Sequence, residues 1–190
     1  MSRESAREKI LETAGPLFYE HGFRAIGVDT IVEQSGVAKM TLYRHFPSKD
    51  DLIAAYLQES HDDSVVWIES LIAPYPEDGQ AAIMALFEGV AEQASKAVCY
   101  GCTFVVAASE FPDATHPAHQ LALSYKQKML EILLTLTQQM GAADPLQLAQ
   151  QLFLLMDGAW AAVRVFGPTS PAQSLVSAVR VLLVASLPEA

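Results

Sequence analysis

The sequence predicts an all-α protein of about nine helices, with a small amino-terminal domain followed by a larger helical domain. Apolar residues recur at helical spacing along nearly the whole chain, and no segment alternates with the period of two that marks a strand. Glycine and proline interrupt this pattern at intervals, as they do between helices. Hydrophobic residues make up 51% of the 190 residues, which is enough to bury a sizeable core and argues against a disordered chain.

The first three predicted helices lie within the first 50 residues. The first covers about 3–21, where Gly22 is placed to end it as a left-handed cap. Pro16 lies inside it and predicts a local kink, because proline removes one backbone hydrogen bond. The second and third helices are expected at 28–35 and 39–46.

The remaining predicted helices are longer. A capping-box pattern, Ser48-Lys49-Asp50-Asp51, opens a fourth helix that continues to about Leu71. Five more are expected at about 78–97, 103–109, 117–140, 145–166 and 171–186. The last two are apolar on more than one face, so another surface must cover them. Since the larger domain is too small to cover them itself, a second copy of the chain is the natural partner. This predicts a homodimer in which these two helices pair with their copies in a four-helix interface.

Residues 28–46 have the pattern of a helix-turn-helix. Two short helices meet at a sharp turn that contains Gly36, which adopts a positive φ at little cost. Four apolar residues hold the helices together: Ile31, Val37, Leu42 and Phe46. The second helix therefore projects five side chains outward: Lys39, Met40, Thr41, Tyr43 and Arg44. This arrangement favours contact with the major groove of double-stranded DNA.

At these residues the chain resembles the TetR (tetracycline repressor) family of transcriptional regulators. The match covers about the first 55 residues and includes Gly22-Phe23, Ile31, Gly36-Val37, Lys39, Thr41-Leu42-Tyr43, His45-Phe46 and Ser48-Lys49 through Leu52. Its most specific part is the run Leu-Tyr-Arg-His-Phe-Pro-Ser-Lys-Asp. Further along, Gly101-Cys102-Thr103-Phe104 and Glu110-Phe111-Pro112 are similar to one subtype of the family's body.

The resemblance implies a DNA-binding repressor that a small, largely apolar ligand releases from a palindromic operator. It implies a DNA-binding domain over residues 1–50, with its motif at about 26–45, and a ligand-binding and dimerisation domain over 51–190. Family positions and the outward face together give seven expected DNA-binding residues: Lys39, Met40, Thr41, Tyr43, Arg44, His45 and Lys49. For each, the alternative is an ordinary solvated helix face.

Four residues depart from the family pattern. Ile26 and Gly27 stand where many members carry Thr or Ser, so a contact from hydroxyl to phosphate is missing. Ala38 replaces a common capping Ser, and Met40 replaces a smaller residue. The departures at Ile26, Gly27 and Ala38 leave open a second hypothesis, a ligand-binding or protein-interaction module that has lost its affinity for DNA.

Nine residues of the body are expected to contact the ligand. They are large apolar side chains and one cysteine: Trp67, Met84, Phe87, Cys102, Phe104, Tyr125, Met129, Met156 and Trp160. Such residues at helical spacing are more often core, and Cys102 is more often a small buried residue than a redox sensor.

The net charge of −10 argues at first against nucleic acid. It is unevenly distributed, because residues 1–50 carry seven basic and seven acidic side chains, whereas residues 51–190 carry all the excess acid. No nucleophile elbow, phosphate-binding loop or metal-binding helix appears, so we expect no enzyme activity, cofactor or metal. With no apolar segment long enough to span a bilayer, no secretory signal and only two cysteines, we expect a cytoplasmic protein without membrane contact.

Overall fold

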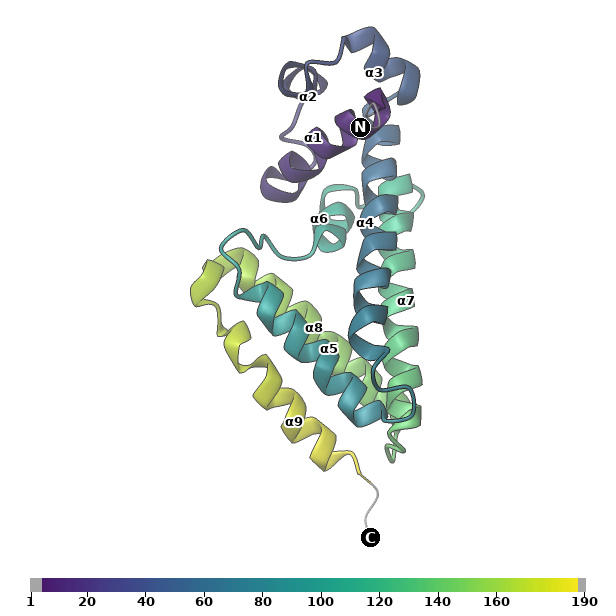
Figure 1. Ribbon diagram of the computed structural model, residues 1–190, viewed down its shortest axis with the longest axis vertical. Coiled ribbons are helices and arrows are strands. Elements are labelled where there is room, and N and C mark those ends of the chain that lie inside the picture. The colour runs from purple at the N-terminus through teal and green to yellow at the C-terminus, as the bar shows by residue number, and fades with distance from the viewer. Residues whose placement is uncertain (1–4, 188–190) are drawn as a thin grey trace. The chain divides into compact units, whose positions relative to one another are not determined.

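The computed structural model describes residues 5–187, except for the side chain of Pro168, and this part of the chain is helical throughout, with no strand. The nine α-helices are α1 (Ala6–His21), α2 (Val28–Ser35), α3 (Lys39–His45), α4 (Lys49–Ile72), α5 (Gly79–Ala94), α6 (Thr103–Glu110), α7 (Pro117–Gln139), α8 (Pro145–Phe166) and α9 (Leu175–Ala185). Two short 3-10 helices, η1 (Gly167–Thr169) and η2 (Pro171–Ser174), join α8 to α9. The predicted all-α fold is confirmed (Figure 1).

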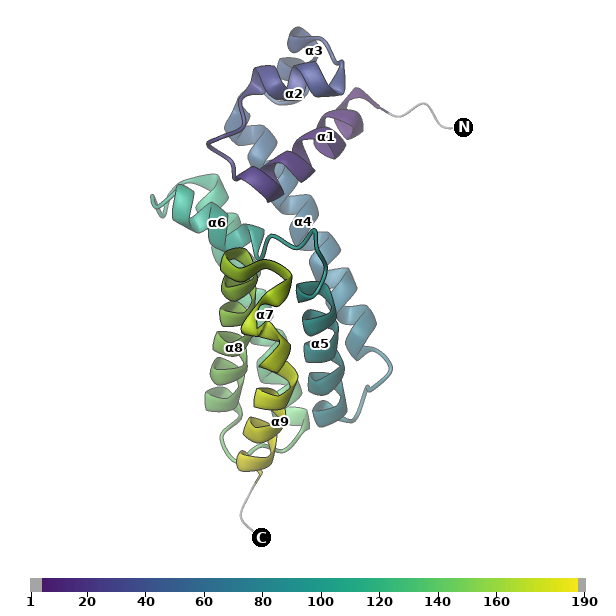
Figure 2. The same ribbon diagram turned by 90° about the vertical axis from the view of Figure 1, so that its left-hand side faces the viewer.

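The helices belong to two compact units. The first comprises residues 1–62 and 103–125, so it holds α1, α2, α3 and α6 with the beginnings of α4 and α7. The second comprises residues 63–102 and 126–190, and within it α5, α8 and α9 lie side by side (Figures 1 and 2). The compact unit that contains the helix-turn-helix therefore extends past residue 50. The functional boundary expected there stays a prediction.

Local hydrogen bonds explain where several helices begin. Ser5 and Glu8 form a capping box at the start of α1, and the bond from the Ser5 backbone N–H lowers the pKa of the Glu8 carboxyl. Ser48 and Asp51 form the box that the sequence predicts before α4. Asp78 caps α5 and Asp144 caps α8, each by accepting a backbone N–H three residues ahead.

Three predicted details are wrong. Gly22 has a positive φ of 84°, but its ψ of 170° is extended, so it is not the left-handed cap expected after α1. The fifth helix ends at Ala94, because the N–H of Ser95 bonds to carbonyls at several spacings. The last helix begins at Leu175, because a separate 3-10 turn, capped by the Ser170 hydroxyl, covers Pro171–Ser174. The predicted start of α1 at Arg3 lies outside the described residues.

Each unit has its own apolar core. In the first, Phe18, Phe23, Ile31, Leu42 and Leu57 are almost fully buried. In the second, the buried set includes several residues expected at the ligand site, and α5 supplies much of it. No helix among the described residues combines the length and apolar character needed to cross a bilayer.

Candidate nucleic-acid interface

Helix α3 exposes most of the side chains that the sequence assigns to DNA. Lys39, Met40, Tyr43, Arg44 and His45 are exposed, and Met40 is 81% accessible. Thr41 is half-buried. Met40 places an apolar side chain beside basic and aromatic ones, a combination suited to contact base edges in a groove.

The opposite side of α3 is fixed to the first unit. Leu42 is completely buried, and Phe46, which follows the helix, is 3% exposed. Gly36 lies between α2 and α3 with φ 63° and ψ 14°, in the left-handed region that glycine adopts without strain. Val37 is only half-buried, so Ile31, Leu42 and Phe46 provide most of the buried contact. These buried apolar residues therefore hold α3 so that its polar side faces outward.

Neither helix of the motif has a side-chain cap at its start. Gly27 precedes α2 and Ala38 precedes α3, and in both cases the helix is closed by backbone hydrogen bonds alone. These are two of the positions where the sequence departs from the family pattern. The start of α2 must therefore be held by packing and by contacts outside the motif.

Lys39 is already paired within the motif. Its Nζ lies 2.5 Å from Oδ1 of Asp29, in the first turn of α2. The hydrogen bond and charge of Asp29 raise the pKa of Lys39 above its ordinary value. Sequence reasoning did not single out Asp29. The sequence offered only an indirect signal, since Asp29 and Lys39 lie ten residues apart, each in the first turn of its helix.

Lys49 begins α4 and is half-buried. Burial lowers its pKa, while the negative charges of Asp50 and Glu110 act in the opposite direction. Glu110, at the end of α6, is therefore near the expected phosphate contact. It also binds the turn between α1 and α2, which sequence reasoning missed because Glu110 is more than 80 residues distant along the chain.

The nine residues expected at the ligand site fall in both units. Phe104 and Tyr125 belong to the first, where their rings stack at 3.9 Å between centroids. The other seven belong to the second. Phe87, Phe104, Met129 and Met156 are buried, which is the core role weighed as the alternative, and the remaining five are half-buried.

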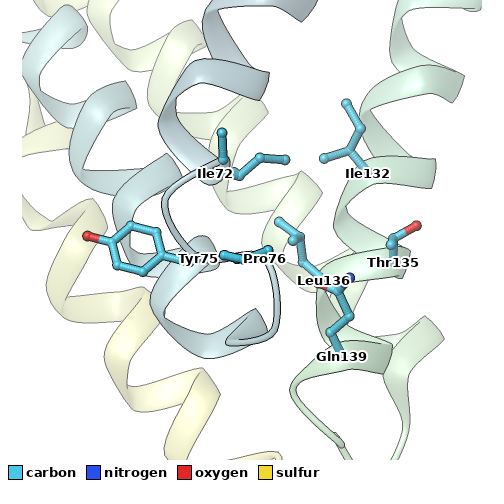
Figure 3. Close-up of a pocket in the computed structure, with 8 residues that line it drawn as sticks. Ile72, Tyr75, Pro76, Ile132, Thr135, Leu136 and Gln139 are labelled. Atoms are coloured by element: carbon cyan, nitrogen blue, oxygen red, sulfur yellow. The ribbon is translucent and has the colours of Figure 1, made fainter.

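A small apolar hollow of about 250 Å³ lies in the second unit, between the end of α4, the loop after it and α7 (Figure 3). Its lining includes Ile72, Pro76, Ile132, Thr135 and Leu136. Tyr75 also lines the hollow, although its ring points away from the other labelled side chains (Figure 3). None of the nine predicted ligand residues lines this hollow. Its volume is slightly below the usual size range of small-molecule sites.

A second hollow, of about 240 Å³, runs along the surface of α8, η2 and α9. It is lined almost entirely by Leu, Ala, Gly and Pro: Leu154, Leu155, Gly158, Ala159, Ala162, Pro171, Ala172, Leu175 and Ala178, with Ser174. Large apolar side chains on the same two helices are exposed, among them Leu154 and Val181. This surface is the one that the sequence assigns to a second copy of the chain.

The chain resembles a known protein family over part of its length and a curated regulator over most of it. The family described as bacterial regulatory proteins, tetR family, matches residues 10–56, which include α2, α3 and the start of α4. The HTH-type transcriptional regulator YjdC of Escherichia coli is 24% identical over 152 residues, which is 80% of each chain.

Two solved structures resemble nearly the whole chain. A TetR-family transcriptional regulator from Streptomyces coelicolor superposes with a TM-score of 0.91 and is 31% identical, over 96% of each chain. A tetR transcriptional regulator from Streptomyces avermitilis has a TM-score of 0.84 and is 32% identical, over 96% of this chain and 98% of the other. The likeness therefore extends well beyond the helix-turn-helix.

Proposed function

Because this chain belongs to the TetR family of DNA-binding transcriptional regulators, we propose that it is a repressor that binds a palindromic operator as a homodimer until a small, largely apolar ligand releases it. Family members of this kind are regulators and not enzymes. The observation that carries the proposal is the exposed face of α3, where Met40 and Tyr43 stand among basic side chains over a fully buried Leu42.

In this proposal α3 enters the major groove and Lys49 contacts the backbone phosphates beside it. The contacts are assigned to Lys39, Met40, Thr41, Tyr43, Arg44, His45 and Lys49. Since residues 1–50 carry no net formal charge, affinity rests on a few phosphate contacts, which a dimer makes twice. The protein would act where the DNA is, in the cytoplasm.

The dimer is proposed from the apolar surface of α8 and α9. Leu154, Val165 and Val181 are each more than two-thirds exposed, although side chains of this kind are usually buried. An identical surface on a second copy would cover them with matching chemistry, through a two-fold contact. A two-fold dimer then explains why the operator is expected to be palindromic.

The ligand would act by binding more tightly to a dimer conformation that does not bind DNA, which lowers the population of the DNA-binding conformation. We retain as its contacts Trp67, Met84, Phe87, Cys102, Phe104, Tyr125, Met129, Met156 and Trp160. Four of these are buried, so ligand entry would require the core to open. The hollow beside Ile72 is a second candidate, because Ile72 ends α4, the helix that Lys49 begins.

The DNA-binding proposal predicts a specific effect of Lys49→Ala. The full-length protein is titrated by fluorescence anisotropy against a duplex obtained by selection from a random library. Wild type should bind as a dimer with strong salt dependence. Lys49→Ala should weaken binding to all duplexes alike. It should also reduce the salt slope, the change of the logarithm of affinity with the logarithm of salt concentration, by about 1 for each DNA-binding domain of the dimer. The matched control is Lys96→Ala, because Lys96 is an exposed lysine in the second unit.

Two outcomes would contradict the proposal. Wild-type protein that selects no duplex, or binds DNA as a monomer without salt dependence, would favour a module that has lost DNA affinity.

The sign of regulation is read from a reporter gene behind the selected operator. Its expression should rise when the regulator is deleted, and a fall would indicate an activator. A ligand found by thermal shift should weaken DNA binding by the factor by which DNA weakens ligand binding.

A further inference from the structure

We propose that Glu110 is a positioning residue for DNA recognition, whose carboxylate holds the turn between α1 and α2 and so fixes the orientation in which α3 faces DNA. This inference rests on the proposed function. Glu110 ends α6, and both of its carboxylate oxygens are used within the first unit. The N–H of Phe23 donates to Oε1 at 3.2 Å, and the N–H of Arg24 donates to Oε2 at 2.7 Å.

The shape of the turn depends on this carboxylate. Gly22 has φ 84° and ψ 170°, a conformation almost restricted to glycine, and it directs the next two N–H groups toward Glu110. A Cβ on Gly22 would collide with Oε1 of Glu110. The N–H of Phe23 is part-buried, so without the carboxylate it would lose a partner that water replaces poorly.

Phe111 strengthens the same contact through side chains. Its ring centroid lies 6.0 Å from that of Phe23, and the Arg24 guanidinium lies over it at 5.6 Å. The His116 ring stacks on the Phe111 ring, nearly parallel to it, with 4.3 Å between the centroids. Glu110 and Phe111 thus hold both the backbone and the side chains of Phe23 and Arg24.

The turn leads directly into the DNA-reading motif. Only three residues separate Arg24 from Val28, where α2 begins, and Gly27 offers no side-chain cap. No capping group of its own therefore fixes the start of α2. Glu110 instead fixes the turn just before α2, and α2 leads to α3 through Gly36.

Neutralising Glu110 distinguishes the positioning role from a purely electrostatic effect on DNA binding. Burial lowers the pKa of Lys49, and the charge of Glu110 is close enough to oppose that lowering. If Glu110 affected DNA only as a nearby negative charge, neutralising it would strengthen binding to phosphate. A positioning role predicts the opposite sign, because Glu110→Gln places an amide N–H₂ against a backbone N–H and breaks one of the two bonds.

The test measures operator affinity of full-length Glu110→Gln and Glu110→Ala. We expect Glu110→Gln to bind the selected duplex about tenfold more weakly, the effect of losing one hydrogen bond to a charged group, and Glu110→Ala, which loses both bonds, to bind at least as weakly as Glu110→Gln. The dimer and the salt slope should not change, since no phosphate contact is removed. Glu33→Gln is the matched control, because it neutralises an exposed acid on α2 and should bind as tightly as wild type or more tightly.

A double-mutant cycle tests the contact itself by urea unfolding. Gly22→Ala should destabilise wild type more than it destabilises Glu110→Ala, because the second background lacks the oxygen with which Cβ collides. Equal effects in both backgrounds, or Glu110→Gln binding as tightly as Glu33→Gln, would overturn the positioning role while leaving DNA binding intact. Wild-type protein that binds no duplex would overturn the proposed function, and the positioning role with it.

Discussion

Before it can contact DNA, Lys39 is engaged in an ion pair with Asp29. In the free protein its Nζ is held by Asp29, and both side chains are largely exposed. The raised pKa keeps Lys39 protonated throughout the neutral range, so this pair introduces no pH dependence there. To reach a phosphate, Lys39 must give up Asp29 or share its ammonium between the two. At the scale of one residue, Asp29 thus limits the affinity that Lys39 can contribute.

This competition predicts that Asp29→Asn strengthens DNA binding several-fold at low salt. The substitution removes a negative charge beside the phosphates and leaves Lys39 with a weaker neutral partner. The measurement is an anisotropy titration over a range of salt concentrations. In a Lys39→Ala background the gain should be smaller, because the released lysine is absent and only the loss of the Asp29 charge remains. Binding unchanged or weakened in Asp29→Asn would show that the pair orients Lys39 for DNA and does not compete with it.

At the scale of elements, the helix starts differ in how they are fixed. α1, α4, α5 and α8 each begin with a polar side chain that accepts a backbone N–H. α2 and α3 have no such cap, although they carry the DNA-reading face. The capped helices keep their ends when neighbouring contacts loosen. The starts of α2 and α3 depend on packing and on the turn that Glu110 holds, so their orientation is open to adjustment.

The cap of α4 predicts that Ser48→Ala lowers the free energy of unfolding by about 1 kcal/mol. The Ser48 hydroxyl accepts the N–H of Asp51, and the substitution leaves that donor without its partner. Urea denaturation followed by circular dichroism measures the change. Ser124→Ala, at an exposed position inside α7, is the control and should be neutral or slightly stabilising, because alanine favours helix. Equal losses at both positions would argue against the capping role.

At the scale of the whole molecule, the surface of α8 and α9 has no apolar cover within the described chain. Leu154 on α8 and Val181 on α9 are 68% and 69% exposed. Burying one such side chain contributes about 1.5–3 kcal/mol, and a two-fold interface buries each of them twice. This surface therefore offers exposed apolar side chains from two helices for association.

The dimer proposal predicts that Leu154→Glu raises the dimer dissociation constant by a factor of about 100 or more, since two buried leucines are lost together. Sedimentation velocity at micromolar concentration measures the change. Val66→Glu is the control, because Val66 is 65% exposed but lies on α4, outside this surface. Operator affinity should fall with the loss of dimer. A Leu154→Glu protein that stays dimeric would place the interface elsewhere.

The sequence by itself determined the features that depend on short stretches of chain. Helical spacing, glycine at the motif turn and the box from Ser48 to Asp51 involve partners only a few residues apart, so their consequences follow from local order. The exposed side of α3 also followed, because burying Leu42 and Phe46 leaves Met40 and Tyr43 outside. The same periodicity predicted the apolar surface of α8 and α9.

Only the tertiary structure decided which distant residues meet. Helical spacing shows which face of a helix is apolar, but it carries no information about the element that packs there, so Phe104 and Met129 could not be separated as core from candidate ligand contacts. For the same reason, Glu110 and the turn that begins at Gly22 could not be paired from a distance of more than 80 residues. Folding brings them together because the part-buried N–H of Phe23 requires an acceptor, and the end of α6 supplies it.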